Sequence, residues 1–129
     1  MSTERVVILK HSVALIPTGV FLDLNKINNY YESANFVPPF LDLRIRSSLA
    51  LKGIFLANGA GVIDSDYPDE IKVPLYNSTD EDFTVQEGDR IAQLLCTTTY
   101  RLKGDVIATM KKRSGGFGST GGQNESLRV

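Results

Sequence analysis

The segment from Gly61 to Tyr67 carries the side chains best suited to chemistry. It reads Gly-Val-Ile-Asp-Ser-Asp-Tyr, an apolar strand end that opens into two acids and an aromatic ring. Asp64 is a candidate general base, because a carboxylate at the mouth of a packed β-scaffold can accept a proton from water on its open side. The same residues also fit an ordinary acidic turn, since Asp and Ser commonly close strands by bonding to the backbone.

The C-terminal segment from Lys111 to Gly122 combines cations, glycines, hydroxyls and one aromatic ring. Glycine N–H groups and hydroxyls can line a phosphate, and Arg113 adds a bidentate charged donor. Phe117, alone among glycines, suits a stacking lid over a planar ring. The alternative is a disordered Gly/Ser linker. Because residues 111–129 have few apolar anchors, we expect a mobile arm there.

One further polar stretch could hold a phosphate, and another leads into a strand. Arg46-Ser47-Ser48 follows a predicted strand and precedes a short helical turn that Gly53 would close, which is a phosphate-binding arrangement. An ordinary cap by Ser47 or Ser48 with a solvated Arg is the alternative. Gly88 to Gln93 is a turn that enters a strand, where Gln93 is either a ligand or a plain polar strand residue.

Strands must position these residues, because most of the chain alternates between apolar and polar positions. The pattern predicts strands at residues 5–10, 13–16, 20–24, 41–46, 71–76, 83–85, 91–97 and 105–110. Turn signals occur at residues 17–19, 77–81 and 86–89, and residues 25–40 read as a long loop. Many short strands with regular turns indicate an all-β sandwich or barrel, with a core over residues 1–110.

Composition excludes several classes of protein. The 129 residues suit one domain, and a net charge of −1 gives no basic face for direct binding of nucleic acid. Cys96 and His11 are the only residues of their types, which excludes an intrachain disulfide framework and a typical zinc cluster. With no long apolar run and no signal peptide, we expect a protein of the cytoplasm, or of the nucleus or host interior, without a membrane partner.

Five stretches, in chain order, resemble the trimeric deoxyuridine triphosphatases (dUTPases). They are Ile16–Gly19 before the family's second motif, Arg46–Ala50 as the second, Asn58–Tyr67 as the third, Gly88–Gln93 as the fourth and Arg113–Gly121 as the fifth. The resemblance implies an all-β jelly roll, or distorted β-barrel, that forms a homotrimer with active sites between subunits. It also implies Mg²⁺-dependent hydrolysis of dUTP to dUMP and pyrophosphate, which limits uracil incorporation into DNA. The Mg²⁺ would be held by substrate phosphates and water, without protein ligands.

The resemblance further implies individual roles. Asp64 would deprotonate the attacking water, and Tyr67 would pack under the deoxyribose and exclude a 2′-hydroxyl. Uracil would be recognised by Asn58, Val62 and Ile63, with Lys72 nearby. The phosphates would be held by Arg46, Ser47, Ser48 and Gln93. The arm would close over the nucleotide through Arg113, Phe117, Gly118, Ser119 and Thr120.

The sequence departs from the family pattern in four places. The first motif, Ala-Gly-x-Asp-Leu, is absent, and residues 25–40 form a longer connection than usual. Asp69 replaces the usual Gly of the third motif, and Arg113 lies one residue closer to Phe117, with Lys112 in the alternative register. The rival interpretations are a non-catalytic, dUTPase-like nucleotide-binding or regulatory protein, a structural jelly-roll subunit, and a dCTP deaminase. The presence of Asp64, Tyr67 and the arm favours dUTP hydrolysis.

Overall fold

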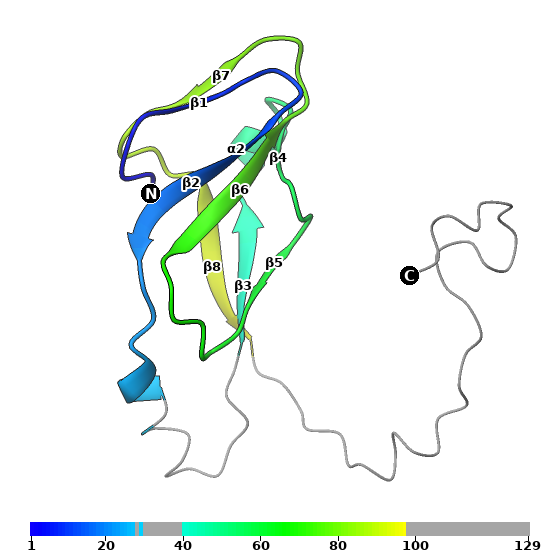
Figure 1. The fold of residues 1–129 in the computed structure, drawn as a ribbon. Helices are drawn as coiled ribbons and strands as arrows, with labels where there is room; N and C mark the ends of the chain where they lie inside the picture. Colours follow the sequence, from blue (N-terminus) through cyan, green and yellow to red (C-terminus); the bar gives the residue numbers. More distant parts are fainter. Residues whose placement is uncertain (28, 30–39, 98–129) are drawn as a thin grey trace, which may run out of the picture.

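The computed structural model describes residues 1–27, 29 and 40–97 (Figure 1). Eight strands form the framework of this part of the chain, and short antiparallel pairings join them. The strands are β1 (Val6–Ile8), β2 (Val13–Val20), β3 (Phe40–Ile45), β4 (Ile54–Leu56), β5 (Gly61–Ile63), β6 (Ile71–Asn77), β7 (Phe83–Val85) and β8 (Ala92–Thr97). One short helix, α2 (Ser47–Ala50), separates β3 from β4.

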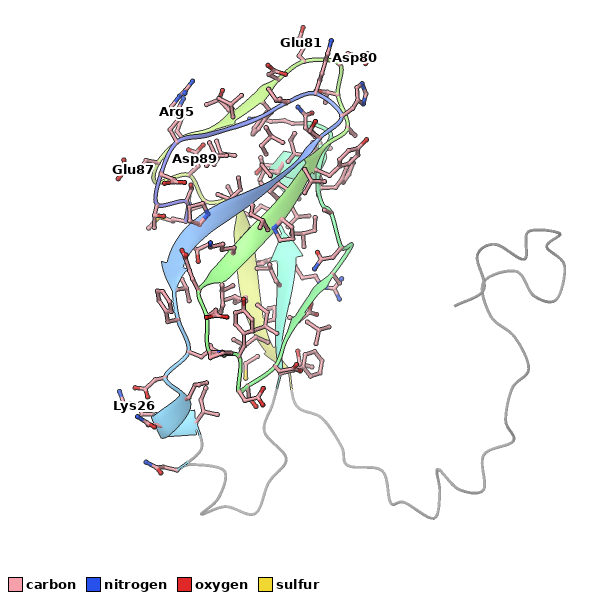
Figure 2. All side chains as sticks on the ribbon, in the orientation of Figure 1. Arg5, Lys26, Asp80, Glu81, Glu87 and Asp89 are labelled. Atoms are coloured by element: carbon pink, nitrogen blue, oxygen red, sulfur yellow. The ribbon has the colours of Figure 1, made fainter. Side chains whose placement is uncertain are left out.

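The strands form three sheets of order β1-β7, β2-β6-β4 and β5-β3-β8. Figure 1 shows β1 and β7 crossing one end of the two larger sheets. The core lies where the sheets face one another, and its buried residues come from all three sheets and α2: Ile8, Ile16, Leu43, Leu49, Ile54, Leu56, Val73, Leu75, Val85 and Ile91. Most charged side chains, including the six labelled in Figure 2, lie on the exposed surface. The all-β class predicted from the sequence is confirmed.

Strand β6 shows why the alternating pattern predicted strands correctly. Ile71, Val73 and Leu75 are buried on the core face, and Lys72 lies exposed between them. Each such apolar side chain stabilises the fold by about 1.5–3 kcal/mol on burial. A slip of one residue would turn all of them to the outside, so the register of β6 against β2 and β4 is strongly specified.

The predicted turn at residues 17–19 is wrong. Strand β2 continues through it, but its register shifts from Ile16 opposite Val73 to Val20 opposite Ile71. Three residues of β2 therefore oppose one residue of β6, which is an extended β-bulge. Gly19 takes a φ of +67° there, a conformation that glycine adopts without steric cost.

Several other boundaries differ from those predicted. A strand was predicted at residues 20–24, but β2 ends at Val20. The loop predicted from residue 25 lies partly in a helical stretch at residues 24–27. There the Asp23 carboxylate accepts the Lys26 N–H at 3.1 Å. The N-cap of α2 is Arg46, without a side-chain cap bond, so neither predicted serine caps it. Strand β4 was not predicted, and the strand predicted at 105–110 and the arm at 111–129 lie outside the described residues.

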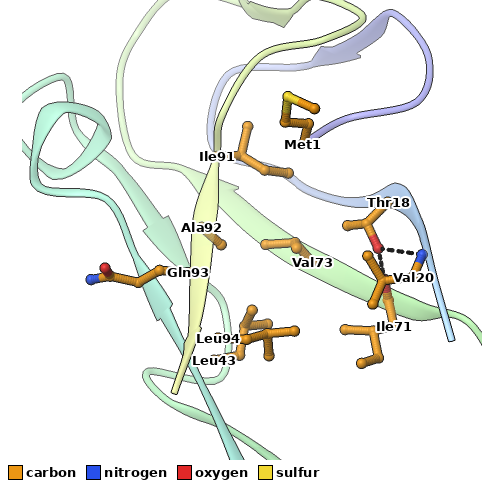
Figure 3. A pocket seen from close by; sticks show the side chains of 10 residues that line it. All are labelled: Met1, Thr18, Val20, Leu43, Ile71, Val73, Ile91, Ala92, Gln93 and Leu94. Carbon is orange, nitrogen blue, oxygen red and sulfur yellow. Dashed lines mark hydrogen bonds between the residues drawn. The ribbon is translucent and has the colours of Figure 1, made fainter. Parts of the chain in front are cut away.

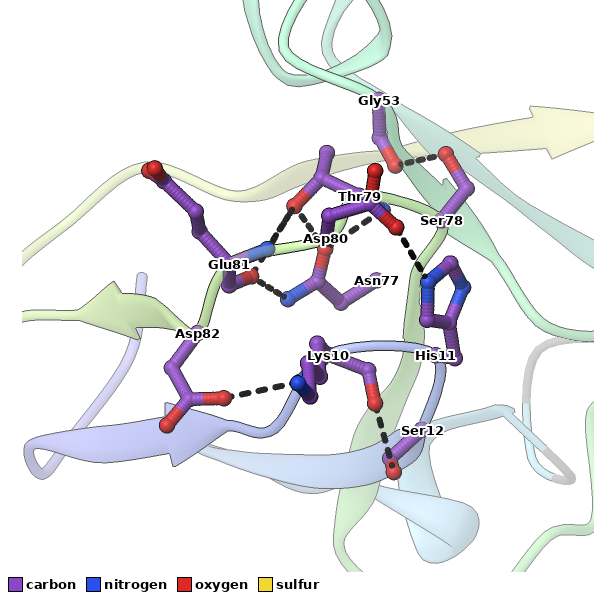
Figure 4. Close-up of polar contacts among 10 residues, drawn as sticks. All are labelled: Lys10, His11, Ser12, Gly53, Asn77, Ser78, Thr79, Asp80, Glu81 and Asp82. Carbon is purple, nitrogen blue, oxygen red and sulfur yellow. Dashed lines mark hydrogen bonds and ion pairs between the residues drawn. The ribbon is translucent and has the colours of Figure 1, made fainter.

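A buried asparagine joins β1, β6 and the following turn (Figure 4). Asn77 is completely buried, and its amide donates to the carbonyls of Ile8 at 3.0 Å and Glu81 at 2.7 Å. Its oxygen accepts from the backbone N–H and hydroxyl of Thr79, at 3.0 and 2.8 Å. The turn is tied to β1 a second time, because the Asp82 carboxylate accepts the Lys10 N–H at 2.9 Å. Asn77 thus replaces backbone pairing where the strands diverge.

We expect Asn77→Ala to lower the free energy of unfolding by about 2 to 4 kcal/mol, because the truncation strands several buried backbone groups. Urea denaturation followed by circular dichroism measures this change. Asn25→Ala, at an exposed position, is the matched control and should change stability by less than about 0.5 kcal/mol. Equal effects of the two substitutions would contradict the structural role of Asn77.

Candidate functional site

The acidic segment lies in the loop that joins β5 to β6. Asp64 directly follows β5, and the Tyr67 N–H donates to the Asp64 carbonyl at 3.1 Å, which closes a tight turn. The Asp64 side chain is exposed, and Tyr67 is 38% exposed. The segment is therefore a turn that presents a carboxylate and an aromatic ring to solvent, and the role of Asp64 as a general base stays a prediction.

Strand β5 leads into this turn, and Gly61 of β5 packs closely against Leu43 of β3. Gly61 pairs with Leu43, and a Cβ added at Gly61 would lie only 2.9 Å from the Leu43 Cβ. A side chain would force the two strands apart, which explains the glycine at this position. Val62 is 65% exposed on the outer face, whereas Ile63 packs against the core.

Asn58 lies at the other end of β5, in the turn that follows β4. The Ala60 N–H donates to the Asn58 carbonyl at 2.8 Å, and Gly59 has a φ of +71°. Asn58 is exposed. The candidate residues of this group therefore lie along one short strand, with Asn58 before it, Val62 and Ile63 on it, and Asp64 after it.

The second group of candidate residues lies where β3 ends and β8 begins. The Arg46 guanidinium donates to the Arg90 carbonyl at 3.4 Å, and the Arg46 N–H donates to the Ile91 carbonyl at 3.4 Å. Ser47 and Ser48 are exposed in the first turn of α2. Gln93 lies two residues beyond Ile91 in β8, and Figure 3 shows its amide pointing away from the apolar cavity between the sheets. The structure thus places Arg46, just after the end of β3, near Gln93 on the neighbouring strand β8, where Gln93 pairs with Arg44.

A polar hollow of about 330 Å³ adjoins Arg46. Besides Arg46 and Ser48, it is lined by Lys52 and Arg90, with the Lys52 amine 5.9 Å from the centre of the Phe83 ring. Sequence reasoning did not single out Lys52 or Arg90. The only available signal was that Arg90 lies inside the Gly88–Gln93 stretch. Asp89 also lines the hollow, but the three cations outnumber this one acid, and the resulting positive charge suits a ligand with several negative charges.

Within a single chain, the candidate residues around β5 lie apart from those where β3 ends and β8 begins. Ile63 pairs with Leu41, so Asp64 lies beside the beginning of β3, whereas Arg46 follows its end. Five residues separate Leu41 from Arg46, which corresponds to roughly 17 Å along an extended strand. Figure 1 likewise places the β5–β6 loop and α2 towards opposite ends of β3. Lys72 belongs to the acidic end, with its amine 4.0 Å from the Glu70 carboxylate.

The remaining candidate residues, Arg113, Phe117, Gly118, Ser119 and Thr120, lie outside the described part of the chain. Within residues 1–27, 29 and 40–97, no group of three or more His, Cys, Asp or Glu side chains could hold a metal ion. Over the same residues, no helix has the length and apolar character needed to cross a membrane.

The chain is similar to known proteins over nearly its whole length. Residues 1–121 match the family model of dUTPase. The deoxyuridine 5'-triphosphate nucleotidohydrolase of Helicobacter pylori (strain J99) is 42% identical over 124 residues, which cover 93% of this chain and 78% of that protein. The protein of the same name from Rickettsia canadensis is 39% identical over 122 residues, covering 92% and 75%. The crystal structure of dUTPase from Streptococcus mutans superimposes with a TM-score of 0.63 at 26% identity, covering 80% and 77%.

We expect Gly61→Ala to destabilise the fold by about 1–3 kcal/mol, because the added methyl group overpacks the contact with Leu43. This cost exceeds the roughly 0.4–1 kcal/mol that a Gly→Ala change gains by restricting the unfolded chain. Urea denaturation measures the difference, with Val62→Ala at the adjacent exposed position as the control. A Gly61→Ala protein as stable as the parent chain would show that β5 can move away from β3 freely.

Proposed function

Because this chain belongs to the dUTPase family, it hydrolyses dUTP to dUMP and pyrophosphate, and we propose that Asp64 is the general base of that reaction. The observation that carries the proposal is the exposed carboxylate of Asp64 directly after β5, in a turn closed by the Tyr67 N–H. The carboxylate takes a proton from the attacking water as the linkage between the α- and β-phosphates breaks. A positioned base typically contributes about 10²- to 10⁴-fold to such a step.

The nucleoside binds along β5 and the turns at its two ends. Asn58 and the backbone at Val62 and Ile63 read the uracil edge in a narrow pocket that clashes with the 5-methyl group of thymine. Tyr67 packs under the deoxyribose and clashes with the 2′-hydroxyl of UTP. The partly exposed Tyr67 ring, held in the same turn as Asp64, supports this assignment because sugar and base catalyst must lie close together.

The phosphates bind to the second group of residues. Arg46, Ser47, Ser48 and Gln93 hold them, and the positive charge of Lys52 and Arg90 in the adjoining hollow supports this role. Phosphoryl transfer needs alignment and charge neutralisation more than covalent help from the protein. Several cations around one hollow supply that neutralisation.

Two copies of the chain must contribute to each site. A bound dUTP needs Asp64 near the phosphates, but one chain separates Asp64 from Arg46 by roughly 17 Å along β3. A homotrimer solves this problem by placing the acidic turn of one copy against Arg46 of the next. The arm of a copy then closes over the nucleotide, with Phe117 on the base and with Arg113, Gly118, Ser119 and Thr120 on the terminal phosphates.

Magnesium would be held in this site by the phosphates of the substrate and by water. The described residues offer no cluster of carboxylates for the ion, and Mg²⁺ keeps several waters and binds readily to phosphate oxygens. When bound, the ion neutralises phosphate charge and so supports attack by water. The residues of the chain hold the phosphates, orient the sugar and accept the proton.

Such an enzyme acts on the nucleotide pool inside the cell, in the cytoplasm. Its net charge of −1 gives it no basic surface for binding nucleic acid.

We expect Asp64→Asn to fold and bind dUTP but to lose hydrolysis by about 10²- to 10⁴-fold. Pyrophosphate release from dUTP, dTTP and UTP, with and without Mg²⁺, measures both the loss and the selectivity of the parent chain. Asp66→Asn, an exposed acid in the same loop, is the matched control and should keep activity. Near-parental turnover by Asp64→Asn would refute the assignment of the base, and equal use of dTTP would refute the uracil pocket.

If each active site takes residues from more than one copy of the chain, two inactive variants should restore activity when they are mixed. Asp64→Asn retains the arm, whereas a chain that lacks residues 112–129 retains Asp64. Unfolding and refolding the two together produces trimers in which Asp64 of one copy meets the arm of another. We expect each variant alone to be inactive, the mixture to recover a substantial fraction of turnover, and light scattering to give the mass of three chains. No recovery from a trimeric mixture would mean that arm and base come from one copy.

A further inference from the structure

Glu70 ends the β5–β6 loop, and its side chain reaches across to β2. One carboxylate oxygen, Oε1, accepts the backbone N–H groups of Thr18 at 3.0 Å and Gly19 at 2.9 Å. The side chain is only 22% exposed, so these bonds are partly shielded from water. A carboxylate that accepts two backbone N–H groups forms a strong, charge-assisted contact.

The bulge in β2 explains why this contact exists. Three residues of β2 oppose one residue of β6, which removes the regular ladder partners of Thr18 and Gly19. The Thr18 N–H is partly buried and needs another acceptor, which the Glu70 side chain provides, and the same oxygen also accepts the exposed Gly19 N–H. The Thr18 hydroxyl donates to the Ile71 carbonyl and accepts the Val20 N–H at 3.2 Å, which ties the bulge to β6 a second time (Figure 3).

The clamp, defined as Glu70 with the N–H groups of Thr18 and Gly19, lies close to the acidic turn. Asp64 to Tyr67 form one turn closed by a backbone hydrogen bond, and only Pro68 and Asp69 separate it from Glu70. Pro68 restricts its own φ and limits the conformations of Tyr67 before it. The position of Glu70 therefore constrains where the Tyr67 ring can lie.

We propose that Glu70 is a positioning residue for dUTP hydrolysis, because its bonds to the β2 bulge fix the loop that carries Asp64 and Tyr67. This inference rests on the proposed function. Glu70 itself acts through the loop and touches no reacting atom. The reach of Glu70 and its acceptor oxygen matter most for this role. Its negative charge strengthens the two bonds and faces the Lys72 amine, 4.0 Å from the other carboxylate oxygen, but it contributes less to where the loop lies.

Three substitutions separate acceptor geometry from charge. Glu70→Gln keeps the length and an oxygen that can accept both N–H groups, so we expect parental kcat/KM and parental preference for dUTP over UTP. Glu70→Asp keeps the charge but is too short, and Glu70→Ala removes the acceptor. Because a displacement near 1 Å can cost up to about 100-fold, we expect kcat/KM to fall about 10- to 100-fold in both, with a loss of preference for dUTP over UTP.

Amide hydrogen exchange provides a readout that does not depend on activity. We expect Glu70→Ala and Glu70→Asp to speed exchange at Thr18 and Gly19 by about tenfold or more, and Glu70→Gln to leave it nearly unchanged. Glu81→Ala is the matched control, because Glu81 is an exposed acid in the turn after Asn77 and should leave both exchange and kinetics unchanged.

Two outcomes would overturn the proposal. In the first, Glu70→Asp keeps activity while Glu70→Gln loses it, which would assign the role to charge. In the second, exchange at Thr18 and Gly19 accelerates while kcat/KM and the preference for dUTP stay parental, which would make the clamp purely structural. Should Glu70→Ala fail to fold, the comparison of Glu70→Asp with Glu70→Gln still tests whether acceptor geometry or charge accounts for the role of Glu70. A parental chain unable to hydrolyse dUTP would refute the proposed function directly, before any variant is compared.

Discussion

The alternation of buried and exposed residues along β6 is the constraint on which the rest of the structure depends. Its buried residues fill the core, and pairing on both edges fixes β2 and β4 in a single register. Asn77 is the last buried residue of β6, and its hydrogen bonds join β6 to β1 and to the following turn. At its opposite end, β6 receives the loop with Asp64, so the geometry of the candidate site follows from the packing of this strand.

Local patterns predicted the strands well wherever one face is buried. Strands β3, β6 and β7 were found because a period of two reflects which side chains enter the core. Prediction failed where tertiary contacts outweigh local preferences. Pro17 and Gly19 are typical turn residues, but β6 and Glu70 hold them within a bulged strand. The cap of α2 was misplaced for a similar reason, since the carbonyl of Ile91, just before β8, accepts the Arg46 N–H.

The candidate site shows the same division between local and distant information. The acidic turn is contiguous in sequence, so Asp64 and Tyr67 could be recognised from it directly. The contact between Glu70 and Thr18 spans 52 positions and could not, because no local pattern reports that pairing. Lys52 and Arg90 were missed because they are far apart in the sequence and line the same hollow only in the folded chain, Lys52 just after α2 and Arg90 just before β8. The roles assigned to the arm remain predictions from sequence.

The length of β3 has a consequence for how the protein behaves as its abundance changes. When the base and the phosphate-binding residues of one site belong to different copies, association becomes part of catalysis, and an isolated chain contributes no turnover. Turnover per molecule then rises with protein concentration until assembly is complete. Under the proposed shared site, a cell that halves its supply of this chain near that threshold would lose more than half of its capacity, and the separation along β3 would make activity rise cooperatively with expression.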